Sequence, residues 1–238
     1  MAALNVLCSG GFRAALVALA PTFATASNLT VAMHWGSSVA GTPTSIPARL
    51  ERGEPADVVI GSSPSLVGLL EAGLLLPGHT RALARSGIGI AVRAGACKPD
   101  VGTVEALTRT LLACRSIAIS TSASGIYLGK LFAALAIDGA LGAKLIRAEA
   151  TPVAEIVASG AAEIGLQQVS ELLPVAGIDL VGPLPAAVQE MTLFSAGVAA
   201  GSQAVPAALR LIDFLAGPAA FASIEQAGMV PAAKDRAR

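Results

Sequence analysis

The sequence predicts an α/β protein made of two Rossmann-like lobes, each built on an open mixed sheet. Three observations support this fold class. Short apolar runs alternate with segments whose apolar residues recur at helical spacing. This alternation continues for about 80 residues and then starts again, as in sheets covered by helices on both faces. Loops rich in glycine and serine follow several expected strands, where open α/β sheets bind ligands.

The first 80 residues are expected to fold as strand, helix, strand, helix, strand, helix. Residues 4–8 form a short buried strand, and apolar residues recur at helical spacing from 12 to 23. Ser63-Pro64 marks a helix start, and Gly73 marks the end of that helix. The other elements expected here are strands at 29–34 and 57–60 and helices at 46–52 and 65–72.

The same alternation is expected in the rest of the chain. Thr103 is placed to cap a helix, with Glu105 in its first turn. The expected strands are 87–92, 116–120, 144–147, 163–167, 179–181 and 193–199. The expected helices are 103–112, 126–136, 151–160, 169–173, 205–215 and 218–226.

Two half-size patterns imply two lobes with a ligand cleft between them. One lobe comprises residues 1–83 plus 190–238, and the other comprises residues 84–189. The chain is expected to cross near residues 80–86 and 182–190. If the last strand and helices return to the first lobe, two strands cross and form a hinge.

Composition excludes several classes of partner. The chain has 238 residues, a formal net charge of +0 and 13% charged residues, with no basic patch, so we expect no nucleic acid partner. No apolar run reaches the roughly 18–20 residues of a membrane-spanning helix, so we expect no membrane span. Residues 1–3 lead directly into the first strand without a signal-peptide pattern. We therefore expect a cytoplasmic protein, or a periplasmic one if a signal peptide has been removed.

The cysteines and histidines do not form a metal-binding pattern. Cys8, Cys97 and Cys114 lie far apart, and none has ligand spacing with His34 or His79. Cys8 and Cys114 lie in or beside apolar runs and are expected to be buried thiols. We expect no metal and no cofactor.

The turn after the first strand is the clearest candidate for a ligand site. Ser9-Gly10-Gly11 joins the strand to a helix, and the first N–H groups of a helix lack intrahelical partners. The glycines allow a ligand close to the backbone, and the Ser9 hydroxyl can bind that ligand or cap the helix. The turn is thus either a small anion site or a capped turn without a ligand. Arg13 can pair with a carboxylate, or it is an ordinary surface arginine.

Other loops at strand ends carry similar groups. Ser37 and Ser38 follow the second strand, residues 120–125 form a second serine- and glycine-rich loop, and Gln167-Gln168 ends a later strand. Hydroxyls, amides and small residues dominate these loops, and none carries a carboxylate. The expected ligand is therefore a small anion.

At these loops the sequence resembles the type II periplasmic-binding-protein fold, and within it the molybdate-binding proteins of ABC importers. Residues 51–60, followed by Ser62 and a run ending at Gly73, resemble the family's turn into its third strand. Ser124-Gly125-Ile126-Tyr127 resembles its Ala-Gly-x-Tyr helix start. The resemblance covers most of the chain and implies an ABC permease as partner.

That resemblance also implies which residues hold the ligand. In this family the oxyanion is bound by serines of the first two loops, N–H groups of the third and a tyrosine of the last. The corresponding positions are Ser9, Ser37 or Ser38, the backbone near Ser122, and Gln167 in place of the tyrosine. Serines also replace the family's proline and alanine in the third loop. An amide- and hydroxyl-rich site favours planar carboxylates over tetrahedral molybdate. The expected ligand-binding residues are Ser9, Gly10, Gly11, Arg13, Ser37, Ser38, Ser122, Ser124, Gly125 and Gln167.

The chain is also similar, at the level of the fold, to aconitate isomerases. Two functions are therefore expected. The first is a solute-binding protein for a small oxyanion, with a carboxylate preferred and a molybdate-like ion as the family's own ligand. The alternative is a cytoplasmic isomerase that moves a proton by a 1,3-shift in a small unsaturated di- or tricarboxylate. The isomerase needs a base, for which His34 and Glu171 are the candidates. As ordinary residues, His34 is a structural strand-end histidine and Glu171 is solvated on a short helix.

Overall fold

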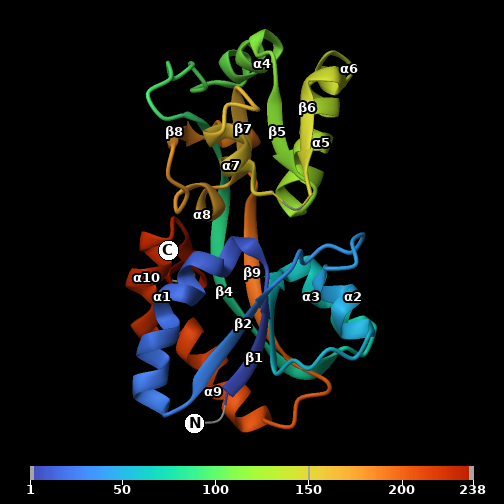
Figure 1. Cartoon of the computed structure of the whole chain (residues 1–238), viewed down its shortest axis with the longest axis vertical. Coiled ribbons are helices and arrows are strands. Elements are labelled where there is room, and N and C mark those ends of the chain that lie inside the picture. Colours follow the sequence, from blue (N-terminus) through green and yellow to red (C-terminus); the bar gives the residue numbers. More distant parts are fainter. Residues whose placement is uncertain (1–2, 150, 236–238) are drawn as a thin grey trace. The chain divides into compact units, whose positions relative to one another are not determined.

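The computed structural model describes residues 3–149 and 151–235 and divides the chain into two compact units (Figure 1). Unit 1 comprises Met1–Ser86 and Thr192–Arg238, and unit 2 comprises Gly87–Met191. The sequence placed these divisions after residues 83 and 189. Met1 and Ala2, on which the expectation about a signal peptide partly depends, lie outside the described residues.

Unit 1 contains a mixed sheet in the order β2-β1-β3-β9-β4, with β10 also paired to β4. β1 is parallel to both β2 and β3, whereas β9 is antiparallel to β3. The carboxyl ends of β1, β2 and β3 therefore meet at one edge of the sheet. The strands are β1 (Ala3–Cys8), β2 (Thr30–Trp35), β3 (Val58–Ser62), β4 (Leu75–Arg93), β9 (Met191–Ala199) and β10 (Val230–Pro231).

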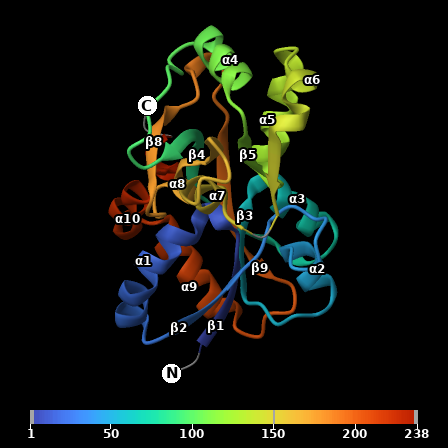
Figure 2. The same ribbon diagram turned by 45° about the horizontal axis from the view of Figure 1, so that its top comes forward.

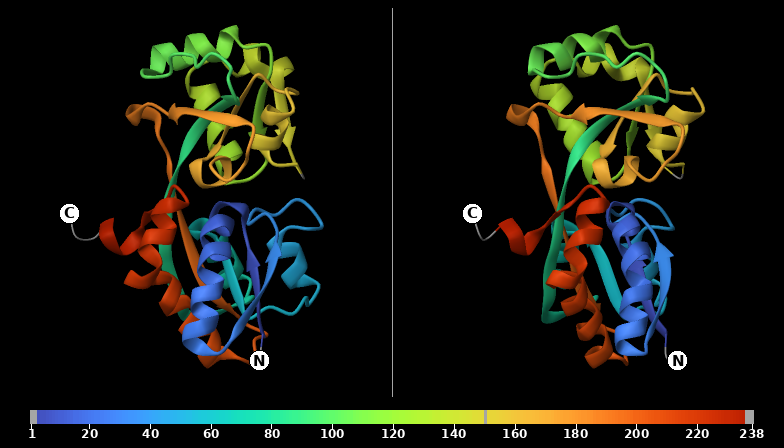
Figure 3. Two further views of the ribbon diagram at one scale, coloured as in Figure 1. Left: turned by 60° about the vertical axis from the view of Figure 1, so that its left-hand side comes forward. Right: turned by 90° about the vertical axis from the view of Figure 1, so that its left-hand side faces the viewer.

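Helices cover both faces of this sheet (Figure 3). On one face, α1, α9 and α10 bury Phe12, Leu211 and Ile224 against Val6 of β1. On the other face, α2 and α3 form a separate apolar cluster with Leu7. The helices are α1 (Gly10–Ser27), α2 (Ile46–Glu51), α3 (Ser63–Glu71), α9 (Val205–Ala216), α10 (Phe221–Gln226) and α11 (Ala232–Asp235), with a 3₁₀ turn at Pro218–Ala220.

Unit 2 contains a second mixed sheet, in which β7 lies between β4 and β5 and β6 lies beyond β5. β5 is parallel to β6 and β7, while β7 and β8 run antiparallel to β4. β4 is thus a strand of both sheets. The remaining strands are β5 (Ile117–Ser120), β6 (Leu145–Ala148), β7 (Ile164–Gln168) and β8 (Ile178–Pro183).

The helices of unit 2 also form two layers (Figure 2). α4 and α5 pack on one face around Leu107, Leu128 and Phe132, and α7 packs on the other through Val153 and Val157. The helices are α4 (Val104–Ala113), α5 (Ala123–Ala134), α6 (Asp138–Leu141), α7 (Val153–Ala158) and α8 (Val169–Leu172), with 3₁₀ turns at Gly142–Lys144 and Ala186–Val188.

β4 is the largest departure from the sequence-based elements. The sequence predicted a strand only at 87–92, but β4 begins at Leu75 and includes Pro77 and Gly78. Most of its first eight residues are at least partly exposed, so the apolar signal of a buried strand is weak there. Within the described residues, no single helix has the length and hydropathy to span a membrane. α9 and α10 meet that criterion only together, with a 60° bend between them.

Candidate functional site

In unit 1, three loops meet at the carboxyl edge of the sheet, because β1 has a parallel strand on each side. The Ser9 N–H donates to the Ile60 carbonyl of β3 at 2.9 Å, and the Gly36 N–H donates to the Cys8 carbonyl of β1 at 3.2 Å. These backbone bonds fix the start of the Ser9 loop between its two neighbours. The edge is where open α/β sheets bind ligands.

Ser9 is the residue before α1 and is 5% exposed. Its hydroxyl makes no capping bond to the helix, and its Oγ has no hydrogen-bond partner among the described residues. Leaving a buried hydroxyl without a partner costs about 1–3 kcal/mol, so most native hydroxyls avoid it. The sequence allowed this hydroxyl either to cap the helix or to bind a ligand, and it does not cap the helix.

Gly10 and Gly11 begin α1, so their N–H groups lack intrahelical acceptors. A Cβ built on Gly11 would lie 2.2 Å from the Phe194 ring. The missing side chain at Gly11 is therefore required for packing against β9. Its N–H remains part of the positive end of an 18-residue helix.

Arg13 lies in the first turns of α1, and its guanidinium carbon is 4.8 Å from the centroid of the Trp35 ring. Arg13 is exposed, and within the described residues no carboxylate lies at ion-pair distance from it. The sequence analysis did not single out Trp35. An aromatic residue at the end of an expected strand, next to a serine- and glycine-rich loop, could have marked Trp35 as a candidate neighbour of the ligand.

The second loop holds a chain of hydroxyls. The Ser38 hydroxyl donates to Ser62 Oγ at 3.4 Å, and Ser62 Oγ lies 2.8 Å from Ser65 Oγ. A cavity of about 270 Å³ is lined in part by Ser38, Ser65 and Glu51. Ser37 is only half-buried, and its Oγ accepts the Val39 N–H at 3.1 Å. Both expected serines thus lie at the same sheet edge as Ser9, but both already have protein partners.

His34 lies on the other face of the sheet from Trp35. It pairs with Leu7, which packs with α2 and α3, whereas Trp35 packs with the α1 cluster. On the α2 side, Arg49 and Glu54 form an ion pair. The hydrogen bond from Arg49 lowers the pKa of the Glu54 carboxyl. The structure therefore does not bring the His34 side chain to the face on which Arg13 lies.

In unit 2, the parallel strands β5 and β7 end side by side. Their last paired residues are Ile119 and Leu166, so Ser120 and Gln167 come next at the same edge. Strand alternation directs both of these side chains to the face that α7 and α8 cover.

The loop after β5 is a cluster of serines. Ser120 Oγ lies 2.8 Å from Ser122 Oγ and 3.0 Å from Ser124 Oγ. A Cβ on Gly125 would lie 1.6 Å from the Ser120 carbonyl oxygen, so only glycine allows α5 to begin this close to the strand end. Ser122 precedes α5, and its side chain makes no capping bond. This loop therefore offers the Ser122 hydroxyl and the first N–H groups of α5.

Gln167 and Glu171 form the second polar centre of unit 2. Gln167 is 4% exposed, and its Nε2 donates to Glu171 Oε2 at 2.8 Å. Its Oε1 is buried and has no hydrogen-bond partner among the described residues. The expectation that Glu171 is solvated is wrong. Part of the side chain remains accessible, but protein surrounds the carboxyl, and this desolvation raises its pKa to about 7.

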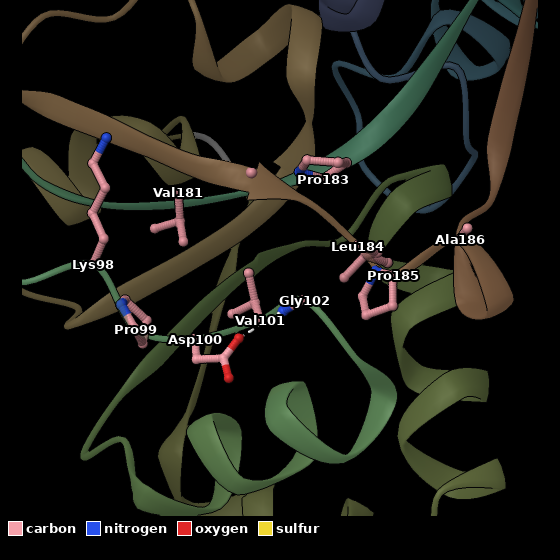
Figure 4. Close-up of a pocket in the computed structure, with 11 residues that line it drawn as sticks. Lys98, Pro99, Asp100, Val101, Gly102, Val181, Pro183, Leu184, Pro185 and Ala186 are labelled. Carbon is pink, nitrogen blue, oxygen red and sulfur yellow. Dashed lines mark hydrogen bonds between the residues drawn. The ribbon is translucent and has the colours of Figure 1, made fainter.

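A cavity of unit 2 lies away from these residues. It has a volume of about 460 Å³ and is lined by residues 98–102 and 181–186 (Figure 4). None of the ligand-binding residues expected from the sequence lines it. Its one ammonium group, on Lys98, donates to the Leu180 carbonyl at 3.0 Å.

The whole chain resembles bacterial solute-binding proteins. Residues 4–230 match the family model described as bacterial extracellular solute-binding protein. The chain is 40% identical over 229 residues to an aconitate isomerase from a Pseudomonas species. This aligned segment covers 96% of this chain and 87% of that protein. Both resemblances expected from the sequence are therefore confirmed.

Solved structures agree with this assignment. The periplasmic molybdate-binding protein of Azotobacter vinelandii has a TM-score of 0.79 at 25% identity, over 95% of this chain and 98% of that one. A sulfate-binding protein from Mycobacterium tuberculosis, with a TM-score of 0.76 at 16% identity over 98% of this chain and 88% of that one, shares the fold. The predicted type II periplasmic-binding-protein fold is confirmed. The chain belongs to the family of bacterial extracellular solute-binding proteins.

Proposed function

We propose that this protein is an isomerase that moves a proton by a 1,3-shift in a small unsaturated tricarboxylate of the aconitate type. One observation carries the proposal. A carboxyl group with a pKa of about 7, that of Glu171, is hydrogen-bonded to a buried amide that has an unpartnered atom. The 40% identity to an aconitate isomerase supports the same reaction class.

Glu171 is suited to the role of general acid and base. A catalytic group works best when its pKa is near the working pH, because it is then both available as a base and able to return the proton. The ionised carboxylate removes a proton from the substrate's methylene carbon, leaving an allylic carbanion delocalised into a neighbouring carboxylate. The neutral carboxylic acid then returns a proton to the other end of the allylic system. The double bond moves by one carbon, and no atom is gained or lost.

The charge of Glu171 determines which amide group of Gln167, the oxygen or the NH₂ group, is left to interact with a ligand. When Glu171 is ionised, the Gln167 NH₂ group donates to it, and the amide oxygen is left unpartnered. When Glu171 is protonated, a flipped amide can accept from the carboxylic acid, which frees its NH₂ group for a ligand carboxylate. Protonation of Glu171 therefore favours binding of the anion, and ionisation favours proton removal.

The Ser9 site, which we define as Ser9, the Gly10 and Gly11 N–H groups and Arg13, supplies groups that bind anions. Hydrogen-bond donors at a helix start stabilise carboxylates and the charge that develops on them during carbanion formation. We propose that this site binds a carboxylate of the ligand. Histidine would serve equally well as a base by chemistry, but His34 lies on the α2 face of its sheet.

A second candidate function is solute binding without catalysis. The family match and the molybdate-binding structural neighbour favour it. In that role the ligand would be a small carboxylate, and the protein would need a periplasmic location and an ABC permease as partner. The two functions differ in whether the bound ligand exchanges a proton.

Proton NMR in D₂O distinguishes the two functions. The protein is incubated with cis- or trans-aconitate, and both isomerisation and loss of the methylene and vinyl proton signals are followed. We expect exchange with the wild-type protein, with a turnover rate that rises with pH through about 7. Glu171→Gln should slow exchange by about 10²–10⁴-fold, the usual contribution of a general base, while aconitate still binds.

Glu155→Gln is the matched control, because Glu155 is an exposed glutamate of α7 in the same unit. It should exchange protons at the wild-type rate. Tight aconitate binding with no exchange between pH 6 and 9 would establish the solute-binding function instead. Loss of exchange in His34→Ala but not in Glu171→Gln would transfer the base to His34.

A further inference from the structure

We propose that Arg13, held against the Trp35 ring, binds one particular carboxylate of the ligand and thereby selects polycarboxylates over ligands that lack it. This inference rests on the proposed ligand class and names the group that recognises it. Trp35 acts as a positioning residue. Both residues lie in unit 1.

Topology brings Arg13 and Trp35 to the Ser9 loop. Trp35 is the last residue of β2 and pairs with Cys8, the residue before Ser9. Arg13 is four residues after Ser9, which is about one turn along α1. The guanidinium carbon lies 4.8 Å from the Trp35 centroid, within the range of a cation–π interaction.

Contact with the Trp35 ring does not by itself use the N–H groups of Arg13. A cation–π contact is made through the face of a guanidinium, whereas carboxylates bind to its N–H groups, which lie in its plane. Arg49 donates to the Trp35 carbonyl at 2.9 Å and is itself paired with Glu54, so Trp35 is held from the other side of the strand. Arg49 is thus committed to protein partners, while Arg13 has no carboxylate partner among the described residues.

A second observation at the same loop points to a ligand. Ser9 Oγ is buried and lacks a partner, beside the free N–H groups of Gly10 and Gly11. A hydroxyl and two N–H groups suffice for one carboxylate. The guanidinium of Arg13 offers a fork for a second one. The Ser9 site is therefore built for a ligand with at least two carboxylates.

Ligands that each lack one carboxylate of trans-aconitate test this assignment directly. Glutaconate lacks the central carboxylate, mesaconate lacks the one on the methylene carbon, and itaconate lacks the one on the vinyl carbon. The dissociation constants of all four ligands are measured by calorimetry for wild-type protein and for Arg13→Gln. Arg81→Gln is the charge-matched control, since Arg81 is an exposed arginine of unit 1 that is 3.4 Å from Asp213.

We expect Arg13→Gln to weaken the binding of trans-aconitate by about 10- to 100-fold, the usual effect of removing a hydrogen bond to a charged group. Arg13→Gln should weaken the binding of one of the three dicarboxylates by less than about twofold. That dicarboxylate is the one that lacks the carboxylate bound by Arg13. Arg13→Lys should recover only part of the loss, because an ammonium cannot form the paired bonds of a guanidinium. Arg81→Gln should bind all four ligands as the wild type does.

The role of Trp35 is tested by coupling. Trp35→Leu should weaken the binding of trans-aconitate by about 3- to 10-fold in the wild-type protein. In the Arg13→Gln variant the same substitution should weaken it by less than about twofold. Trp35→Phe keeps an aromatic face and should retain most of the affinity. Trp35 is the one tryptophan of the sequence, so its fluorescence also reports ligand binding at this site.

Two results would overturn the inference while leaving the proposed function intact. One is an equal loss of affinity for all four ligands in Arg13→Gln, which indicates a general charge effect. The other is unchanged trans-aconitate binding in Arg13→Gln by a protein that still isomerises aconitate. If the wild-type protein binds none of the four ligands, the proposed function fails together with this inference.

Discussion

Two buried polar atoms distinguish the site residues from the other buried polar groups of the described chain. Ser9 Oγ and Gln167 Oε1 are the side-chain atoms there that are buried and lack partners. Each unsatisfied group costs about 1–3 kcal/mol of stability. A ligand carboxylate that accepts from the Ser9 hydroxyl, and from the Gln167 NH₂ group once the amide has flipped, would recover part of this cost.

Glu171 makes the stability of the protein depend on pH in a direction opposite to that of most carboxylates. Its pKa is raised from 4.5 to about 7 in the folded protein by desolvation. Between these values the native state holds a proton that the unfolded chain has released, so stability falls as pH rises. The full shift corresponds to about 3 kcal/mol, and partial exposure of the side chain reduces the expected effect to about 2–3 kcal/mol.

Glu171→Gln should therefore match the wild type at pH 4, below the unfolded-state pKa of the carboxyl, and exceed its stability by about 2–3 kcal/mol at pH 8. Urea denaturation at the two pH values measures this difference. Glu155→Gln, the exposed control, should show no such gain. An equal effect of Glu171→Gln at both pH values would mean that the carboxyl is not desolvated in the native state.

At the scale of elements, two helix starts with similar residues have different roles. Thr103 Oγ1 accepts the Ala106 N–H at 3.1 Å and caps α4, as the sequence predicted. Ser9 stands at the same position before α1, but its side chain makes no such bond. Capping interactions contribute about 1 kcal/mol. α1 therefore lacks the capping contribution that α4 has, and the Ser9 hydroxyl is left without a partner among the described residues.

Ser9→Ala and Thr103→Ala should separate these roles. Ser9→Ala should raise the free energy of unfolding of the unliganded protein by about 1–3 kcal/mol, because it removes a buried hydroxyl that has no partner. It should also weaken carboxylate binding by about 10- to 100-fold. Thr103→Ala should lower the free energy of unfolding by about 1 kcal/mol and leave binding unchanged. Unchanged ligand affinity in Ser9→Ala would mean that the turn binds no ligand and that the Ser9 site is wrongly assigned.

The sequence predicted the elements whose signals are local. The turn from β1 into α1 follows from Ser9-Gly10-Gly11 and the helical spacing after it, and the α4 cap follows from Thr103. β4 extends further than predicted, because pairing with distant strands holds its partly exposed first half. The environment of Glu171 also depends on distant residues, since a four-residue helix has no periodicity from which burial can be read.

At the scale of the whole molecule, the family scaffold allows one fold to serve binding and catalysis. Both units are α/β layers, and each brings hydroxyls, amides and helix N–H groups to the carboxyl ends of its parallel strands. Such an edge supplies hydrogen-bond donors of the kind that bind anions. What would turn a binding protein into an isomerase is one group able to exchange a proton near neutral pH, and we propose Glu171 for that role.

Ligand choice should therefore be visible in the stability of the whole protein. A ligand that binds only the native state adds about 2.7 kcal/mol at 100 times its dissociation constant. For a chain of 238 residues this should raise the melting temperature by roughly 5–10 °C. A thermal-shift panel should contain molybdate, tungstate, sulfate, phosphate, citrate, both aconitates and simple dicarboxylates. We expect a tricarboxylate to give the largest shift, because the Ser9 site carries donors for more than one carboxylate, and the shift should shrink in Ser9→Ala. A larger shift with molybdate would instead assign this chain the ligand of its molybdate-binding structural neighbour.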